Sequence, residues 1–119
     1  MKDFKTTELW RDTLSMYGHY VPFYKLLREK GIYRLAEQME ASCGSVSDNI
    51  AEGLTRISRK EKMQFLYIAK ASCAEFQNQL YRLDAHKIVN SKEIEKLVAS
   101  SESILAQLQG LINFYKKQP

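Results

Sequence analysis

Four cationic side chains lie within one short stretch of the sequence. Arg56, Arg59, Lys60 and Lys62 fall within seven residues, and Glu61 is the only acid among them. Lysine and arginine bind phosphate oxygens, and a helix that begins here would add the positive pole of its N-terminus. This pattern predicts a surface for nucleic-acid phosphates. The same residues also fit a solvated turn that keeps the protein in solution, and both interpretations stay open.

Histidines are the next residues that could do chemistry, and their spacing argues against it. A di-iron bundle needs a glutamate three residues before a histidine, but Met16 precedes His19 and Leu83 precedes His86 at that spacing. A helical ribonuclease of the HEPN type would need more residues between its arginine and histidine than separate Arg82 from His86. Neither pattern predicts an active site.

The two cysteines, Cys43 and Cys73, both fall on apolar helical stripes. This placement predicts buried thiols in a reducing compartment. They are too scattered relative to the histidines for a metal site, and a catalytic thiol would need a histidine beside it in the fold. We therefore expect no enzyme activity, no catalytic residue, no metal and no cofactor, and an RNA-processing enzyme is the least favoured alternative.

Length and composition indicate one ordinary globular domain over residues 1–119. The 119 residues are 45% hydrophobic and 27% charged, and 18 Lys+Arg against 14 Asp+Glu give a formal net charge of +4. This mild excess is compatible with a polyanionic partner without requiring one. The charged start of the chain lacks a secretory signal and no apolar run is long enough to span a bilayer. We expect a cytoplasmic protein without a membrane partner.

Apolar residues recur every three or four positions in the second half of the chain, which predicts two bundle helices. The third helix should run from Ser58, whose side chain can cap it together with Glu61, to about His86. Its stripe is Leu66, Ala69, Cys73, Phe76, Leu80 and Leu83. The fourth should run from about Ser91 to Tyr115, after a cap at Asn90. Its stripe is Ile94, Leu97, Val98, Ser101, Ile104, Leu105, Leu108, Leu111, Ile112 and Tyr115.

Two further helices are expected before these. The second runs from about Ile32 to Ala51, and Gly53 is placed where a C-terminal cap would use it. Its stripe is Ile32, Leu35, Met39, Cys43, Val46 and Ile50. The first begins near Thr7, and Pro22 either kinks it, so that it continues to about Arg28, or ends it. Its stripe is Trp10, Leu14, Tyr17, Val21 and Tyr24.

Four amphipathic helices with short connections bury their stripes best against each other. The sequence therefore predicts an all-α fold, an antiparallel up-down-up-down four-helix bundle whose first helix is kinked at Pro22.

The centre of the chain resembles a known family. Residues 45–53 read Ser-Val-Ser-Asp-Asn-Ile-Ala-Glu-Gly, followed by Ser-Arg-Lys-Glu at 58–61, Phe-Leu-Tyr-Ile-Ala at 65–69, and Ser72 with Glu75. This pattern is similar to the four helix bundle protein family, first described as proteins encoded in intervening sequences of bacterial 23S rRNA. Its shared residues include Asn49, Glu52, Gly53, Ser58 and Glu61.

The resemblance implies an up-and-down bundle that assembles as a homopentamer, and for most family members the role is unknown. Some members serve as accessory proteins of reverse transcriptases, where a basic surface engages nucleic acid and the polymerase. The segment 21–31 is longer than the first connection that the family pattern would have, which leaves the helix boundary near Pro22 open.

Two groups of residues complete the candidate sites. Asn49, Glu52 and Gly53 are interpreted as structural, with the two polar side chains bonded across the bundle or capping the loop before Ser58. Aromatic residues off or beside the stripes suggest a subunit interface at Tyr20, Phe23 and Tyr33.

Together these patterns predict a non-enzymatic, self-associating bundle that acts as a nucleic-acid-binding or adaptor scaffold, with RNA or DNA and a reverse transcriptase as candidate partners. The alternative is a purely structural homo-oligomer that does not bind nucleic acid.

Overall fold

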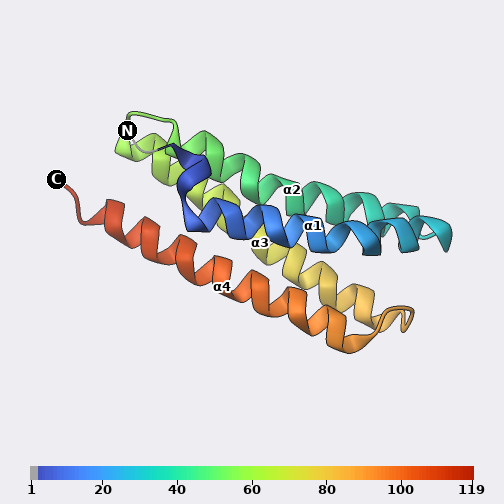
Figure 1. Ribbon diagram of the computed structural model, residues 1–119. Helices are drawn as coiled ribbons and strands as arrows, with labels where there is room; N and C mark the ends of the chain where they lie inside the picture. The colour runs from blue at the N-terminus through green and yellow to red at the C-terminus, as the bar shows by residue number, and fades with distance from the viewer. Residues whose placement is uncertain (1–2) are drawn as a thin grey trace.

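The structure, a computed structural model, describes residues 3–119, which fold into four long α-helices after one short 3-10 helix (Figure 1). The elements are η1 Phe4–Thr6, α1 Glu8–Glu29, α2 Tyr33–Leu54, α3 Arg59–Ala85 and α4 Ser91–Lys116. Successive helices run antiparallel in a rod of 50 × 21 × 19 Å, and residues 3–119 contain no strand. The predicted four-helix bundle is confirmed.

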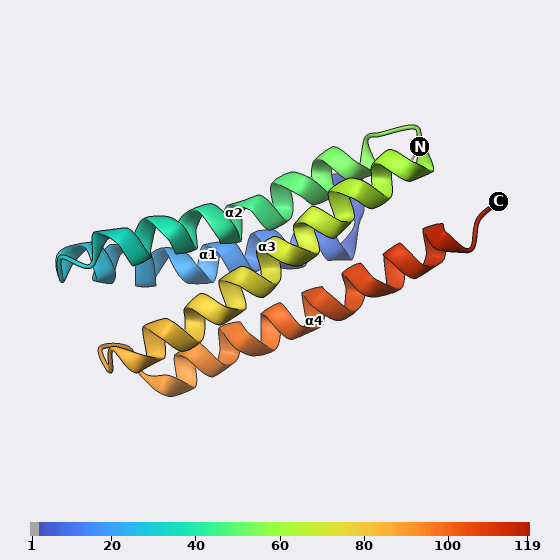
Figure 2. The ribbon, with the colours of Figure 1, turned by 180° about the vertical axis from the view of Figure 1, so that it is seen from behind.

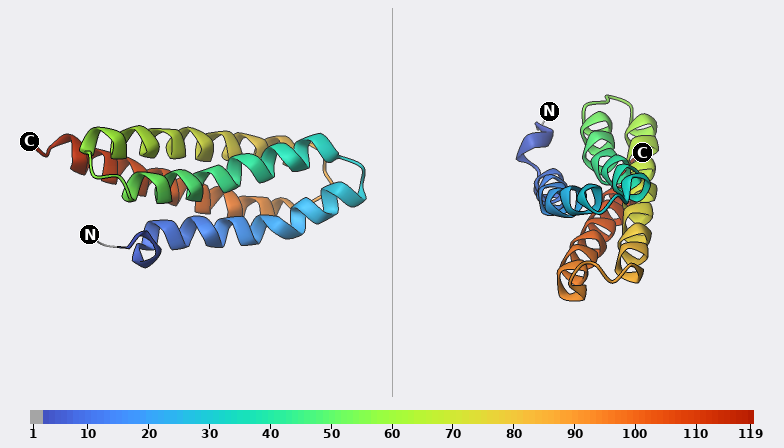
Figure 3. Two further views of the ribbon diagram at one scale, coloured as in Figure 1. Left: turned by 90° about the horizontal axis from the view of Figure 1, so that it is seen from above. Right: turned by 90° about the vertical axis from the view of Figure 1, so that its right-hand side faces the viewer.

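The helices follow one another around the bundle axis, as the end-on view in Figure 3 shows. The α2–α3 loop lies at the same end of the rod as both termini, and the α1–α2 and α3–α4 loops lie at the other end (Figure 2). Helices α2 and α3 pack most closely, whereas α1 and α4 make the fewest contacts of the neighbouring pairs. The α1/α4 side is therefore the loosest part of the bundle.

Side chains cap the starts of three helices at the predicted residues. The caps accept hydrogen bonds from backbone amides: Thr7 from Trp10 at 3.3 Å, Ser58 from Glu61 at 3.3 Å and Asn90 from Lys92 at 2.8 Å. Gly31 has a φ of 76°, and it ends α1 by taking the left-handed conformation while its amide bonds to the carbonyl of Arg28.

The predicted stripe of α3 is buried along its whole length, and those of α2 and α4 are buried or half-buried. Because facing stripes meet along the axis, they form one continuous apolar core. Its largest fully buried side chains include Met16, Tyr20, Met39, Phe76 and Leu80.

The predicted stripe of α1 is wrong by one position. The residues that α1 buries are Leu9, Thr13, Met16, Tyr20 and Leu27. Leu14, which was expected inside, is 48% exposed, and Trp10, Tyr17, Val21 and Tyr24 are only half-buried. Two adjacent faces of α1 carry apolar or aromatic residues at helical spacing, so periodicity alone selected the wrong face.

Helix α1 continues through Pro22 to Glu29, which agrees with the alternative in which the proline does not end the helix. Proline has no amide hydrogen, so the carbonyl of Gly18 loses its partner one turn later. Gly18 and Pro22 are both exposed, so that water can bond this carbonyl.

Candidate nucleic-acid interface

The predicted basic cluster lies at the α2–α3 loop and the first turn of α3. Ser58 caps α3, so that Arg59 and Lys60 are its first two residues. The amides of this turn point out of the helix and carry the positive pole of its dipole. An anion bound here would meet both the cations and the helix terminus, although the four cations differ in what they contact.

Arg56 is held by its own chain. Its Nη2 atom lies 2.8 Å from Oε2 of Glu52, and its guanidinium lies 4.9 Å from the centre of the Phe65 ring. Its Nε atom is buried and has no hydrogen-bond partner within residues 3–119. Arg56 therefore fastens the loop to both flanking helices rather than projecting from it.

Arg59 and Lys62 contact the C-terminal ends of other helices. Lys62 Nζ donates to the carbonyl of Leu54, the last residue of α2, at 3.4 Å. Arg59 Nη1 donates to the carbonyl of Tyr115 near the end of α4 at 3.5 Å. Such carbonyls form the negative pole of a helix, so both cations stabilise the bundle end.

Lys60 is exposed, and across residues 3–119 its side chain forms no ion pair or hydrogen bond. Tyr67 follows it two turns later on the same face of α3 and is 42% exposed. Lys116 of α4 places its Nζ 5.8 Å from the centre of the Tyr67 ring. We call Arg59, Lys60, Tyr67 and Lys116 the α3 basic surface.

The structure thus divides the predicted cluster. Lys60 and Arg59 belong to the α3 basic surface, although Arg59 also bonds to the Tyr115 carbonyl. The contacts of Arg56 and Lys62 are to α2 and α3. Cations beside an exposed aromatic ring suit single-stranded nucleic acid, because phosphates and bases can be bound together. Sequence reasoning missed Tyr67, for which the seven-residue spacing from Lys60 was a signal, and it did not include Lys116 in the site.

The polar residues at the centre of the sequence pattern join α2 to α3. Asn49 Nδ2 donates to the carbonyl and to Oγ of Ser45, both at 2.8 Å, and Ser45 Oγ lies 2.9 Å from Ser72 Oγ. Glu52 binds Arg56 in the loop. Asn49 was expected to bond across the bundle, but it reaches α3 only through Ser45.

A second polar link lies deeper between the same helices. Ser42 Oγ donates to Oε1 of Gln79 at 2.6 Å, and Gln79 Nε2 donates to Glu75 Oε2 at 3.4 Å. Ser42 and Gln79 are both buried, so their bond satisfies polar atoms that water cannot reach.

Gly53 does not cap α2, as the sequence had suggested, but lies inside it. A Cβ atom at this position would stand 3.1 Å from Phe65 Cβ and 3.2 Å from the Lys62 carbonyl oxygen. The missing side chain therefore lets the first turns of α3 approach α2, and the helix continues to Leu54. Close backbone approach, and not a left-handed turn, explains this glycine.

The three residues expected at a subunit interface differ in exposure. Tyr20 is fully buried and donates a hydrogen bond to the Ala36 carbonyl, so its assignment to an interface is wrong. Phe23 is half-buried against the core. Tyr33 is 55% exposed beneath the Arg28 guanidinium, 5.2 Å from the ring centre, and its interface role stays a prediction.

Both cysteines are free and buried. Burial raises the pKa of the Cys73 thiol to about 12 and raises that of Cys43 as well, so both stay protonated at neutral pH. Within residues 3–119 no three His, Cys, Asp or Glu side chains come together as metal ligands. In that same part of the chain, no helix combines the length and the apolar character needed to cross a bilayer.

These features define a helical-bundle protein with a basic surface at one end. The family model for "23S rRNA-intervening sequence protein" matches residues 5–110, and the chain therefore belongs to that family. No protein with a curated description matches the chain.

One similar solved structure is a protein of unknown function from the S23 ribosomal protein family of Bacteroides thetaiotaomicron. It has a TM-score of 0.83 and 24% sequence identity, over 87% of this chain and 97% of that chain. At this identity the likeness supports the fold alone. Neither description names an enzymatic activity.

Proposed function

We propose that the protein is a non-enzymatic, self-associating scaffold of the cytoplasm that binds single-stranded RNA or DNA through the α3 basic surface. The observation that carries this proposal is the free Lys60 at the N-terminus of α3, on the same face as the exposed Tyr67 with Lys116 over its ring. The family description refers to an intervening sequence of 23S rRNA, so RNA is the first nucleic acid to test. An adaptor role would add a protein partner such as a reverse transcriptase.

Self-association is the second part of the proposal, with a homopentamer as the expected assembly. Helix α3 exposes Ile68 and Tyr81, which are 48% and 56% exposed, with the small residues Ala71 and Ala74 between them. Ile68 and Tyr81 flank the solvent-facing side of α3, and exposed apolar and aromatic side chains of this kind are typical of an oligomer interface. Light scattering should give about five times the 13.8 kDa chain mass, and a monomer at micromolar concentration would reject the assembly.

Fluorescence anisotropy with a labelled single-stranded RNA tests the nucleic-acid part. The variant Arg59→Gln/Lys60→Gln/Lys116→Gln removes the three cations of the surface and keeps Arg56 and Lys62. Because Arg59 also bonds to the Tyr115 carbonyl, circular dichroism should confirm that the variant is folded. Its affinity should fall, and the slope of log K against log salt should decrease by about 2, because each lost phosphate contact removes about 0.7.

A matched control carries the same loss of charge at the other end of the rod. Lys25, Lys30 and Lys92 are exposed, and the variant Lys25→Gln/Lys30→Gln/Lys92→Gln should keep both affinity and salt slope. If both variants weaken binding equally, only the net charge attracts RNA and the surface assignment is wrong. If the unchanged protein binds no RNA at low salt while it still assembles, the purely structural homo-oligomer is the correct alternative.

A further inference from the structure

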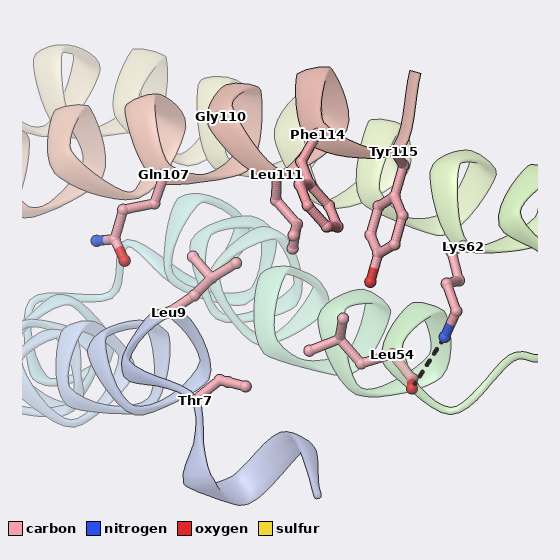
Figure 4. Close-up of a pocket in the computed structure, with 9 residues that line it drawn as sticks. All are labelled: Thr7, Leu9, Leu54, Lys62, Gln107, Gly110, Leu111, Phe114 and Tyr115. Carbon is pink, nitrogen blue, oxygen red and sulfur yellow. Dashed lines mark hydrogen bonds between the residues drawn. The ribbon is translucent and has the colours of Figure 1, made fainter. Parts of the chain in front are cut away.

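An apolar groove opens between the start of α1, the end of α2 and the last turns of α4, with a volume of about 570 Å³ (Figure 4). Its walls are Leu9 of α1, Leu54 of α2, and Leu111 and Phe114 of α4. The preceding η1 packs against α1 and α2. The last turns of α4 extend past the start of α1 (Figure 1), and Phe114 is 55% exposed.

Gly110 widens this groove. It lies on an exposed turn of α4 that lines the groove, and a Cβ atom built there would meet no heavy atom within 4 Å. A side chain at this position would therefore extend into open space at the edge of the groove and not into the core.

One end of the groove is cationic. Lys62 Nζ makes a single long hydrogen bond, 3.4 Å to the Leu54 carbonyl, which leaves its other two hydrogens free. In Figure 4 the Tyr115 hydroxyl points toward this same end. Arg59, which does not line the groove, adds a second cation near this end because it bonds to the Tyr115 carbonyl. Near the opposite end Gln107 Nε2 donates to Asp12 Oδ2 at 3.0 Å, which places an acidic side chain at the end of the groove away from Lys62.

We propose that this groove binds an amphipathic monoanion, such as a medium-chain or long-chain carboxylate. The chain would lie against Leu9, Leu111 and Phe114, and the carboxylate would accept hydrogen bonds from Lys62 and Tyr115. The volume falls within the range of about 300–1,000 Å³ that is usual for small-molecule sites. The groove is apolar along its length and has hydrogen-bond donors at one end. This arrangement suits an amphipathic anion, because charge-assisted hydrogen bonds to its head would fix the orientation of the bound molecule.

Calorimetric titration with decanoate, below its micelle concentration, tests the site. Decyltrimethylammonium has the same chain length with the opposite charge on its head. Decanoate should bind at least about tenfold more tightly, since only its head can accept from Lys62 and Tyr115. Equal binding of the two amphiphiles, or no decanoate binding up to about 1 mM, would overturn the proposal.

Two pairs of variants separate binding in the groove from general effects of charge and hydrophobicity. Gly110→Leu fills the groove and should abolish decanoate binding, whereas Gly18→Leu, at another exposed helical glycine with free space around it, should not. Lys62→Gln should weaken decanoate about tenfold, and Lys60→Gln, nearby on α3 but outside the groove, should leave binding unchanged. Circular dichroism confirms that each variant folds, and Phe114→Ala provides a second change in the groove wall that should reduce affinity.

A second copy of the chain is the rival occupant. In that case the unchanged protein would not take up decanoate, and Gly110→Leu would lower the mass measured by light scattering. Together these two results would show that the groove is a contact between subunits and not a ligand site. The decanoate test does not depend on the outcome of the RNA test. The RNA variant keeps Lys62, and the variants expected to lose decanoate binding keep Lys60.

Discussion

The hydroxyl of Tyr20 donates a 2.8 Å hydrogen bond to the backbone carbonyl of Ala36, which joins α1 to α2 inside the core. The Tyr20 ring also meets the Phe76 ring edge-on, with 5.5 Å between the ring centres. One side chain of α1 thus contacts both α2 and α3. Its pKa is raised by burial, so the phenol stays protonated and remains a donor over the physiological range.

Removing only this hydroxyl should weaken the bundle measurably. Tyr20→Phe keeps the ring contact with Phe76 and leaves the Ala36 carbonyl without its side-chain donor. We expect the free energy of unfolding to fall by about 1–2 kcal/mol in urea titrations followed by circular dichroism. Tyr81→Phe is the matched control, because Tyr81 is 56% exposed. Equal effects of the two changes would show that the buried bond contributes nothing specific.

Two helical glycines should respond in opposite directions to alanine. Gly53→Ala places a Cβ 3.1 Å from Phe65 Cβ and 3.2 Å from the Lys62 carbonyl oxygen. Neither atom can move without the backbone of α3, so α2 and α3 must move apart. We expect a loss of about 1 kcal/mol or more despite the better helix propensity of alanine. Gly110→Ala meets open space and should gain up to about 1 kcal/mol. Thermal unfolding of both variants measures the two changes in stability. A higher stability of Gly53→Ala would contradict the explanation that α3 approaches α2 closely at Gly53.

The sequence was sufficient for the fold wherever a helix has one apolar face. In α3 the residues from Leu66 to Leu83 that recur every three or four positions are all buried. In α1 the same rule selected the wrong face, because Tyr17 and Tyr24 on one face compete with Met16 and Tyr20 on the next. The misplaced stripe also led to the assignment of Tyr20 to an interface. Which face turns inward depends on packing partners that periodicity does not contain.

The candidate site could be predicted only in part for a related reason. Spacing placed Arg56, Arg59, Lys60 and Lys62 together, but it could not show that two of them contact helix ends and one stacks on Phe65. Those contacts depend on how α2, α3 and α4 end beside each other. The groove beside Gly110 was also beyond the sequence, because it follows from the place where α1 begins relative to the end of α4.

Arg56 and Lys60 should therefore differ in what they do for stability. Arg56→Ala removes the ion pair with Glu52 and the guanidinium from the face of Phe65, and we expect the free energy of unfolding to fall by about 1 kcal/mol. Lys60→Ala should change stability by less than about 0.5 kcal/mol, since its side chain is solvated. Urea titrations of the two variants measure the difference. If Lys60→Ala destabilised the protein as much as Arg56→Ala, the division of the cluster would be wrong.

The buried thiols make stability fall at alkaline pH. Below pH of about 8.5, the usual pKa of a thiol, Cys43 and Cys73 are protonated in both the folded and the unfolded chain. Above it, the unfolded chain releases protons that the folded protein retains, because burial raises both folded pKa values, to about 12 for Cys73. The unfolded state then binds fewer protons, so the free energy of unfolding decreases as the pH rises.

Between pH 8.5 and 9.5 the two thiols together should remove about 2 kcal/mol of stability. This window lies below the usual pKa of tyrosine, about 10, so that phenols contribute little. Urea titrations at several pH values measure the slope, and Cys43→Ala/Cys73→Ala serves as the comparison. That variant will be less stable at neutral pH because it leaves small cavities, but its stability should depend much less on pH over the same window. Identical slopes for the two proteins would mean that the thiols ionise as readily in the fold as in the unfolded chain.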